Sequence, residues 1–198
     1  MPRLARLVQK EALSGLEFAC GIPGSIGGGI RMNAGAYDGE VSDVLVSSTY
    51  IDEKLNIRIL SKKDHNFSYR YSYFKDNPSC VIIGAEFKLK KFNENNIKEK
   101  MEKYSLSRKE KQPLEYPNAG STFKRPEGHF VGSMIQDLGL KGYRIGNIEV
   151  SEKHAGFIVN KGDAKAQDAI KLMEHLREKV FEKYKVKLEN EIEIIGEE

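Results

Sequence analysis

Residues 20–36 read CGIPGSIGGGIRMNAGA, and this stretch is the most informative part of the chain. Its six glycines are Gly21, Gly24, Gly27, Gly28, Gly29 and Gly35. Glycine tolerates a positive φ and lets a ligand approach the backbone without a Cβ in the way. Successive exposed N–H groups in such a segment make a concave site for anions such as phosphates. The pattern is equally typical of a tight connection between two packed elements, so both interpretations stay open.

Two common phosphate-binding motifs do not occur in this stretch. It matches neither the dinucleotide pattern G-x-G-x-x-G nor the pattern G-x-x-x-x-G-K-[ST]. The glycines therefore predict neither a Rossmann crossover nor a P-loop.

The composition is that of a globular protein. The 198 residues suffice for one large domain or two small ones with a real core. With 31% charged and 39% hydrophobic residues, the chain is not of the disordered class. The formal net charge of +3 suits an anionic small molecule and is too weak to indicate a nucleic-acid partner.

The cysteines and apolar runs indicate a cytoplasmic protein. Cys20 and Cys80 lie far apart and form no metal-like pattern with the four histidines, so we expect free thiols and no metal. The longest apolar runs are too short to cross a bilayer. Residues 1–15 lack the apolar core of a signal peptide. We expect no membrane partner.

Apolar periodicity predicts the elements of the first half. A helix is expected over 3–13, and strands over 44–51 and 57–60 joined by a turn at 52–56. Less apolar positions from Ile82 to Lys90 alternate with apolar ones, which predicts a half-buried strand. Its apolar side carries Val81, Ile83, Ala85, Phe87 and Leu89. These elements predict a first α/β unit over about residues 1–90.

The second half predicts a mixed α+β unit. A mostly solvated helix is expected over 93–111, and Asp163 is in place to cap a long apolar-faced helix. A final strand is expected over 188–195, with Ile192 and Ile194 on one side. Helices and strands alternate without a regular βαβ rhythm.

Arg70 stands in FSYRYSYF, where aromatic residues alternate with shorter side chains. One interpretation is an amphipathic strand whose outward arginine is only solvated. The other is an arginine among aromatic rings, whose planar fork grips a carboxylate through two hydrogen bonds.

Ser121 and Glu191 are less distinctive when the residues are taken alone. A serine after a glycine is usually part of a turn or a helix cap, and no G-x-S-x-G elbow points to an acyl-transfer nucleophile. Glu191 is one of several acids in LENEIEIIGEE, and spacing does not separate it from Glu189 or Glu193.

Five segments carry a family resemblance: GLEFACGIPGSIGGGIRMNAGAY at 15–37, SYRYSYFK at 68–75, PNAGSTFKRPEGHFVGSMIQDLGLKGYRIG at 117–146, VSEKHAGFIVN at 150–160 and LENEIEIIGE at 188–197. Together, and in this order, they resemble the UDP-N-acetylenolpyruvoylglucosamine reductases, also called UDP-N-acetylmuramate dehydrogenases. These are bacterial FAD enzymes of peptidoglycan precursor synthesis. The resemblance covers nearly the whole chain.

The resemblance implies an α+β fold with three parts. These are the C-terminal part of an FAD-binding α/β domain of the vanillyl-alcohol-oxidase/PCMH type over 1–90, an α+β substrate-binding domain over 91–190, and a strand returning to the active site over 191–198.

The implied activity is that of an FAD-dependent NADPH oxidoreductase. It reduces UDP-N-acetylenolpyruvoylglucosamine to UDP-N-acetylmuramate in the cytoplasm, a step on which cell wall biogenesis, cell shape and cell division depend. The expected partner is the UDP-sugar substrate, and the expected assembly is a monomer.

The family motifs imply three catalytic residues. They place the catalytic arginine at Arg70, the serine that protonates the substrate carbon at Ser121, and the catalytic glutamate at Glu191. Arg70 and Glu191 are expected to stabilise charge developing on the enolpyruvyl carboxylate, and Ser121 to act as general acid. Two residues after this glutamate the relatives usually carry an arginine near the flavin, where this chain has Glu193.

The resemblance also implies two binding sets. Flavin contacts are expected from Gly21, Ile22, Pro23, Gly24, Ser25, Gly27, Gly28, Ile30, Asn33, Gly35 and Ala36. Substrate contacts are expected from Tyr37, Lys124, Arg125, Tyr143 and Lys153, because cations and phenol hydroxyls suit the oxygens of a diphosphate.

The similar enzymes carry a longer N-terminal part, with a further Gly-rich turn that grips the flavin pyrophosphate. We therefore expect this chain alone to hold FAD weakly or not at all. The alternative function is a flavin-free UDP-sugar-binding module or an inactive remnant, which would purify colourless instead of yellow.

Overall fold

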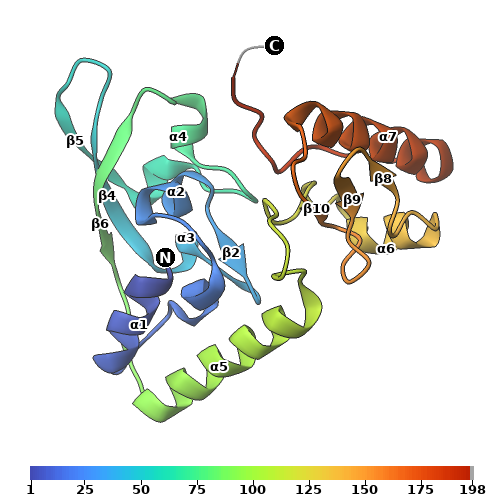
Figure 1. Cartoon of the computed structure of the whole chain (residues 1–198). Coiled ribbons are helices and arrows are strands. Elements are labelled where there is room, and N and C mark those ends of the chain that lie inside the picture. Colours follow the sequence, from blue (N-terminus) through green and yellow to red (C-terminus); the bar gives the residue numbers. More distant parts are fainter. Residues whose placement is uncertain (197–198) are drawn as a thin grey trace. The chain divides into compact units, whose positions relative to one another are not determined.

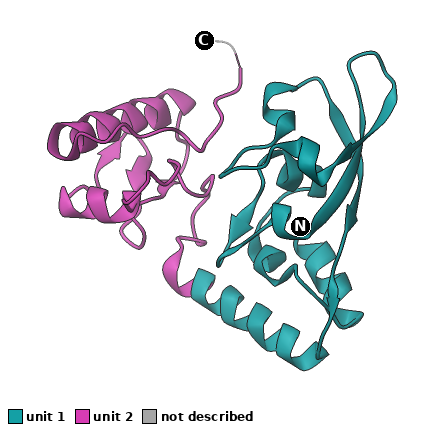
Figure 2. Cartoon of the chain, turned by 180° about the vertical axis from the view of Figure 1, so that it is seen from behind, with its two compact units in different colours: residues 1–108 teal, residues 109–198 magenta. Residues whose placement is uncertain are grey.

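The computed structural model describes residues 1–196 and divides the chain into two compact units, Met1–Arg108 and Lys109–Glu198 (Figure 2). The boundary differs from the one expected near residue 90. Helix α5 (Glu94–Lys111) buries Ile97 and Met101 in the hydrophobic core of the first unit, which keeps most of the helix there. None of the described helices is long and apolar enough to cross a membrane.

A three-stranded antiparallel sheet in the order β5-β4-β6 forms the frame of unit 1 (Figure 1). Its strands are β4 (Leu45–Ile51), β5 (Ile57–Ser61) and β6 (Val81–Phe87). The strands expected over 44–51 and 57–60, and the turn between them, are confirmed. Tyr50 and Ser48 of β4 are buried against the core, where the sheet presents its inner face.

The burial expected for β6 is confirmed at its end, where Phe87 packs on the core, and wrong at its start. Val81 and Ile83 are 57% and 51% exposed, and Ala85 is exposed as well, whereas Ile82 packs on the core. Ile82 pairs with the buried Tyr50, and a register shift between Thr49 and Tyr50 precedes this pair. The pairing register, which the sequence pattern alone does not contain, decides which face of the strand turns inward.

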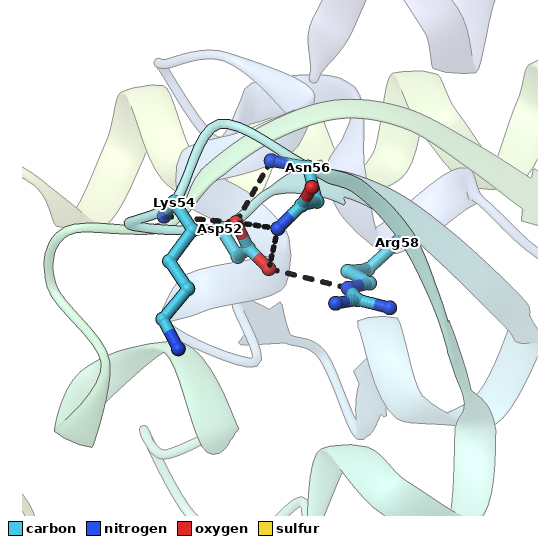
Figure 3. Close-up of polar contacts among 4 residues, drawn as sticks. All are labelled: Asp52, Lys54, Asn56 and Arg58. Carbon is cyan, nitrogen blue, oxygen red and sulfur yellow. Dashed lines mark hydrogen bonds and ion pairs between the residues drawn. The ribbon is translucent and has the colours of Figure 1, made fainter.

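The turn between β4 and β5 is held by one carboxylate (Figure 3). Oδ1 of Asp52 accepts hydrogen bonds from the backbone N–H groups of Lys54 (2.9 Å) and Asn56 (2.8 Å), and Oδ2 lies 3.2 Å from Nε of Arg58. These hydrogen bonds, that from the Asn56 N–H first, lower the pKa of Asp52. An aspartate at the start of a turn commonly fixes it in this way.

Short elements complete unit 1. Helix α1 (Pro2–Lys10) confirms most of the helix expected over 3–13. The remaining elements are β1 (Leu13–Ser14), the 3-10 helix η1 (Glu17–Gly21), α2 (Ile26–Arg31), β2 (Gly35–Ala36), β3 (Gly39–Glu40), α3 (Val41–Val44), η2 (Lys62–His65), α4 (Tyr73–Asp76) and β7 (Lys90–Lys91). Strand β1 pairs with β7, and β2 pairs with β3.

Unit 2 packs two helices on a small sheet. The antiparallel strands β8 (Arg144–Ile145), β9 (Ile148–Val150) and β10 (Ile158–Asn160) run in the order β10-β9-β8. Helices α6 (Val131–Asp137) and α7 (Ala166–Tyr184) supply Ile135, Leu172 and Leu176 to a core that is fully closed to solvent at these positions. The mixed α+β class is confirmed.

Two local expectations in unit 2 are wrong. Helix α7 begins at Ala166 after Lys165, and Asp163 instead lies in a left-handed conformation (φ 48°) outside the helix. The strand expected over 188–195 does not form within the described residues, because only Asn190 makes a β-bridge, to Phe123. Residues 197–198 of the expected returning strand lie outside the described residues.

A buried histidine ties η2 to the sheet. His65 is closed to solvent, and its Nδ1 lies 2.7 Å from the carbonyl oxygen of Ser61, so this nitrogen carries the proton. In the neutral ring Nε2 then accepts from the hydroxyl of Ser48 at 2.8 Å. The ring stacks on Phe67 with centroids 4.7 Å apart. Burial lowers the pKa of His65, against the smaller opposing effects of the Ser61 carbonyl and the Asp64 charge.

The neutral His65 should make the stability of unit 1 depend on pH. Because its pKa is lower in the folded chain than in the unfolded one, stability is complete above about pH 6.5 and falls as the pH drops through the folded pKa. His65→Gln should flatten this fall by up to about 1.4 kcal/mol per pH unit. Urea unfolding of both proteins between pH 7.5 and 5 measures it, and equal slopes would contradict the assignment.

Candidate functional site

The Gly-rich segment folds as a 3-10 turn, a short helix and a strand. After η1, the hydroxyl of Ser25 accepts a hydrogen bond from the N–H of Gly28 at 3.0 Å and so begins α2. The helix ends at Arg31, and β2 begins at Gly35 after three intervening residues. Serine is a strongly preferred residue at this capping position, because its oxygen satisfies an N–H that has no partner inside the helix.

Three of the glycines have other protein atoms close to the position of a Cβ, and at Gly35 one of these atoms belongs to the backbone. A Cβ on Gly21 would lie 2.9 Å from Nε of Arg108, and one on Gly29 would lie 2.8 Å from Sδ of Met1. A Cβ on Gly35 would lie 2.9 Å from the carbonyl oxygen of Gly39. These positions therefore behave as a tight connection between packed elements.

The other three glycines have no such constraint from packing. Gly24 has a φ of +120° and nothing near its Cβ position, and Gly28 is exposed with only the Ser25 hydroxyl at 3.3 Å. A Cβ on Gly27 would make an ordinary van der Waals contact with the side chain of Ile82, at 3.4 Å. Only Gly24 among the segment's glycines takes a positive φ. The backbone at Gly24 and Gly28 thus presents a surface that a Cβ would cover, with the Ser25 hydroxyl beside it.

Asn33 connects this segment to two others. Its side chain is completely buried, and Nδ2 donates to the carbonyl oxygen of Ser68 at 3.0 Å. Its Oδ1 accepts from the N–H of Ser42 at 2.9 Å. Asn33 has a left-handed φ of 42°, which asparagine tolerates better than most residues. Both ends of the amide are therefore used to hold the Gly-rich segment, the start of α3 and the loop before Arg70 together.

Arg70 lies at the tip of a tight turn and not on an amphipathic strand. Ser68 and Tyr71 form an isolated β-bridge around it, and Arg70 has a left-handed φ of 56°. Its Nη2 donates to the carbonyl oxygen of Gly35 at 3.1 Å, and its Cζ lies 4.8 Å from the centroid of the Tyr69 ring. The structure thus brings Arg70 to the end of the Gly-rich segment.

Tyr37 follows directly after this segment and lies on helix α5. Its ring stacks on Tyr104 with centroids 4.1 Å apart and planes 2° from parallel, and its hydroxyl donates to the Tyr104 carbonyl oxygen at 2.8 Å. Its hydroxyl is therefore used in an internal hydrogen bond.

In unit 2, the side chain of Asn118 shapes the loop that leads to Ser121. Its Nδ2 donates to the carbonyl oxygens of Pro113 and Tyr116, and its Oδ1 accepts from the N–H of Gly120 at 3.0 Å. Gly120 has a φ of +82°, a conformation that favours glycine. Ser121 follows and is exposed.

The extended segment 121–124 begins with Ser121 and has a neighbouring segment on each side. On one side Ser121 bridges to Phe157. On the other side the carbonyl oxygen of Thr122 accepts from the N–H of Glu191 at 3.0 Å. Glu191 is half-buried. Two expected catalytic residues therefore stand on adjacent extended segments of unit 2.

Lys124, at the far end of this segment, also belongs to the arrangement. Its N–H donates to the carbonyl oxygen of Glu189 at 2.8 Å, and its Nζ lies 3.1 Å from the Glu189 carboxylate. Because both side chains are exposed, the ion pair itself adds little stability. The pairing leaves the charge of Lys124 at the surface beside the segment.

The other expected substrate residues of unit 2 are held in separate local contacts. The guanidinium of Arg125 lies over the Phe130 ring at 3.9 Å, and Tyr143 stacks on His175 with centroids 4.5 Å apart. Nζ of Lys153 donates to the carbonyl oxygen of Lys109 at 2.8 Å, in the last turn of α5.

His154 is a packing residue beside the same segment. Burial lowers its pKa, and its Nδ1 accepts from the N–H of Gly156 at 3.1 Å. The carbonyl of Gly156 in turn accepts from the N–H of Thr122 at 2.9 Å. A neutral ring of this kind shapes the loop next to Ser121.

Three residues contribute to these arrangements without having been expected from the sequence. Arg108 of α5 donates to the carbonyl oxygen of Gly21, and Asn118 shapes the loop before Ser121. The buried Thr122 joins the segment 121–124 to the segments on both sides of it by hydrogen bonds. Asn118 carried a local signal, because asparagine before Ala-Gly often folds a turn. The contact of Arg108 spans 87 positions and has no local signal.

The chain matches one family model and many known proteins. The model described as "UDP-N-acetylenolpyruvoylglucosamine reductase, C-terminal domain" matches residues 112–195. The UDP-N-acetylenolpyruvoylglucosamine reductase of Caldicellulosiruptor saccharolyticus is 52% identical over 197 residues, which are 98% of this chain and 63% of that protein. The corresponding reductase of Latilactobacillus sakei is 51% identical over 93% of this chain and 61% of its own length.

A solved structure agrees with these matches. The crystal structure of UDP-N-acetylenolpyruvylglucosamine reductase from Thermus caldophilus superposes with a TM-score of 0.85 and 34% sequence identity. The superposition covers 96% of this chain and 68% of that one. The chain thus spans a little over three fifths of the length of the two curated relatives named above.

Removing the amide of Asn33 should loosen the site in unit 1. Asn33→Gly keeps the left-handed backbone and loses both hydrogen bonds, so the free energy of unfolding should fall by about 2 kcal/mol or more. Asn33→Asp keeps an acceptor for the Ser42 N–H and loses the donor to Ser68. Urea unfolding measures the effect, with Asn95→Ala on the exposed face of α5 as control. A loss within about 0.5 kcal/mol of the control would contradict the role of Asn33.

Proposed function

The chain belongs to the UDP-N-acetylenolpyruvoylglucosamine reductase family, and we propose that it carries out the substrate-reducing chemistry of such an enzyme. The proposed reaction converts UDP-N-acetylenolpyruvoylglucosamine to UDP-N-acetylmuramate in peptidoglycan precursor synthesis, with FAD as cofactor and NADPH as reductant. The observation that carries the proposal is that the segment 121–124, which begins with Ser121, accepts a hydrogen bond from the N–H of Glu191 through Thr122, in a chain half identical to reductases of this name.

The Gly-rich segment is the proposed flavin contact of unit 1. The backbone at Gly24 and Gly28 and the hydroxyl of Ser25 fit a ligand that approaches the main chain closely, because a Cβ there would fill the space. When bound, FAD would take electrons from NADPH and supply the hydride that the enol ether receives at its β-carbon. The other expected flavin contacts are proposed to come from the same segment, between Gly21 and Ala36.

Arg70 is proposed to bind the carboxylate of the enolpyruvyl group. Its guanidinium is oriented by the carbonyl of Gly35 and the ring of Tyr69, so its orientation is already restricted before a substrate binds. Addition of hydride to the β-carbon places negative charge on the α-carbon and its carboxylate. A cation fixed beforehand beside that charge lowers the barrier without reorganising during the reaction.

Ser121 and Glu191 are proposed to complete the reaction. Ser121 delivers its hydroxyl proton to the α-carbon as general acid, which forms the new C–H bond and leaves an alkoxide that regains a proton from solvent. Glu191 is proposed to stabilise the negative charge that develops on the enolpyruvyl carboxylate. The exposure of Ser121 lets a substrate reach its hydroxyl.

The diphosphate of the substrate is proposed to bind the cationic residues of unit 2. Lys124, Arg125 and Lys153 provide donors for phosphate oxygens, and the phenol of Tyr143 adds another. The Tyr37 hydroxyl already donates to the Tyr104 carbonyl oxygen, so Tyr37 would have to give up this hydrogen bond before it could donate to a phosphate. Of these, Lys124 is the best supported, because it lies on the same extended segment as Ser121, three residues further along.

Flavin retention separates this function from the alternative, a UDP-sugar-binding module without flavin. Yellow protein that oxidises NADPH when the enolpyruvyl substrate is added would support the reductase. Colourless protein that binds UDP-sugar and gains no flavin on titration with FAD would support the module.

The proton-donor role makes a specific kinetic prediction for the chain loaded with FAD. Ser121→Ala should leave reduction of the flavin by NADPH unchanged and slow the reaction with the enolpyruvyl substrate by a factor of roughly 10² or more. Stopped-flow absorbance separates the two steps, and Ser133→Ala on the exposed face of α6 is the control. Equal slowing of both steps would mean that Ser121 is structural.

The glycines should separate cofactor binding from folding. Gly28→Ala adds a methyl group to an exposed helical position, so thermal stability should stay near wild type while the Kd for FAD rises roughly tenfold or more. Gly35→Ala brings a Cβ against the backbone carbonyl oxygen of Gly39, which cannot move aside as a side chain can, and should lower the melting temperature. Titration of FAD fluorescence and circular dichroism melting measure the two effects. Unchanged FAD affinity in Gly28→Ala would argue against a flavin at this backbone.

A further inference from the structure

Thr122 lies at the centre of the arrangement that carries Ser121 and Glu191. Its side chain is 1% exposed, its N–H donates to the Gly156 carbonyl oxygen at 2.9 Å, and its carbonyl oxygen accepts from the Glu191 N–H at 3.0 Å. Any residue could make these two backbone bonds. The chemistry specific to threonine is that of its hydroxyl.

The hydroxyl of Thr122 satisfies a buried backbone group. Its Oγ1 accepts a hydrogen bond from the N–H of Ile158 at 3.2 Å, and Ile158 is itself buried at the start of β10. A buried N–H without an acceptor costs as much as a lost hydrogen bond. An apolar side chain at position 122 would therefore leave Ile158 N–H without its partner.

This hydrogen bond also fixes the register of the segment. Successive residues of an extended chain point to opposite faces, so a slip of one residue against β10 would exchange the faces of Ser121 and Thr122. In the observed register Ser121 is exposed and Thr122 is buried. The slipped register would bury Ser121 and expose Thr122. The isolated bridges on either side, Ser121 to Phe157 and Phe123 to Asn190, provide little register information of their own.

We propose that Thr122 is a positioning residue for the reaction assigned to Ser121 and Glu191, an inference that rests on the proposed function. Its hydroxyl anchors the segment 121–124 to β10. This keeps Ser121 exposed and keeps the Thr122 carbonyl oxygen in place to accept the hydrogen bond from the Glu191 N–H. Thr122 itself is buried and acts only through these two residues.

The first test uses hydrogen exchange in the 198-residue chain. Thr122→Val keeps the shape of the side chain and removes the acceptor, so exchange at the amides of Ile158 and Glu191 should rise by roughly tenfold or more. Thr122→Ser should restore slow exchange at both amides. If Thr122→Val does not fold, Thr122→Ala removes the same acceptor with less bulk.

Val180→Ala is the matched control. Val180 of α7 is fully buried in the hydrophobic core of unit 2, and it does not belong to the segment 121–124. It should raise exchange along α7 and leave the Glu191 amide unchanged. The inference is overturned if Thr122→Val leaves exchange at Ile158 and Glu191 within about twofold of wild type, or if Val180→Ala raises it equally.

The second test measures catalysis in the chain loaded with FAD. Thr122→Val should slow the reaction with the enolpyruvyl substrate by roughly tenfold or more while flavin reduction by NADPH is unchanged, and Thr122→Ser should recover most of the rate. Val180→Ala should affect neither step. If Ser121→Ala leaves the substrate step unchanged, the proposed function is wrong. If Ser121→Ala slows it and Thr122→Val does not, the positioning inference alone is wrong.

Discussion

The buried amide of Asn33 is the constraint on which the site in unit 1 depends. It replaces backbone pairing where three irregular segments meet, and each end of the amide has a different partner. An amide has both a donor and an acceptor at fixed geometry, so it can join a carbonyl of one loop to an N–H of another. The turn that carries Arg70 is held beside Gly35 as a result.

In unit 2, side-chain hydrogen bonds also hold together segments that lack regular backbone pairing. The catalytic candidates there lie on extended segments too short to form regular strands, and each pair of neighbours shares only one or two hydrogen bonds. The side chains of Asn118 and Thr122 supply the missing bonds from positions directly beside or near Ser121. In both units, polar side chains with few degrees of freedom take over where backbone ladders end.

Local signals in the sequence predicted the regular elements well. The hairpin of β4 and β5, helix α5 and the core-facing side of α7 follow from apolar periodicity and a turn-forming Asp-x-x-x-Asn, all of which act within a few residues. The resemblance, and not periodicity, selected Ser121 and Glu191, which in the structure lie on neighbouring segments joined through Thr122.

What could not be predicted was decided by distant contacts. One interpretation placed Arg70 on a strand, yet the segment around it forms a turn. Its residues are held by two partners that are distant in sequence, since Asn33 donates to the Ser68 carbonyl and Arg70 donates to the Gly35 carbonyl. The inner face of β6 depends on its register against β4. The tail after Leu188 alternates like a strand, but it has a single bridged partner residue and stays irregular.

The exposed isoleucines of the three-stranded sheet have a practical consequence for measurements. Ile57 and Ile59 on β5 are 68% and 74% exposed, and Val81 lies on the same sheet with 57% of its surface open. A hydrophobic dye that reports unfolding by binding newly exposed apolar surface would already bind this face in the native chain. Dye-based melting curves would start from a high fluorescence baseline, and far-ultraviolet circular dichroism would follow the true transition.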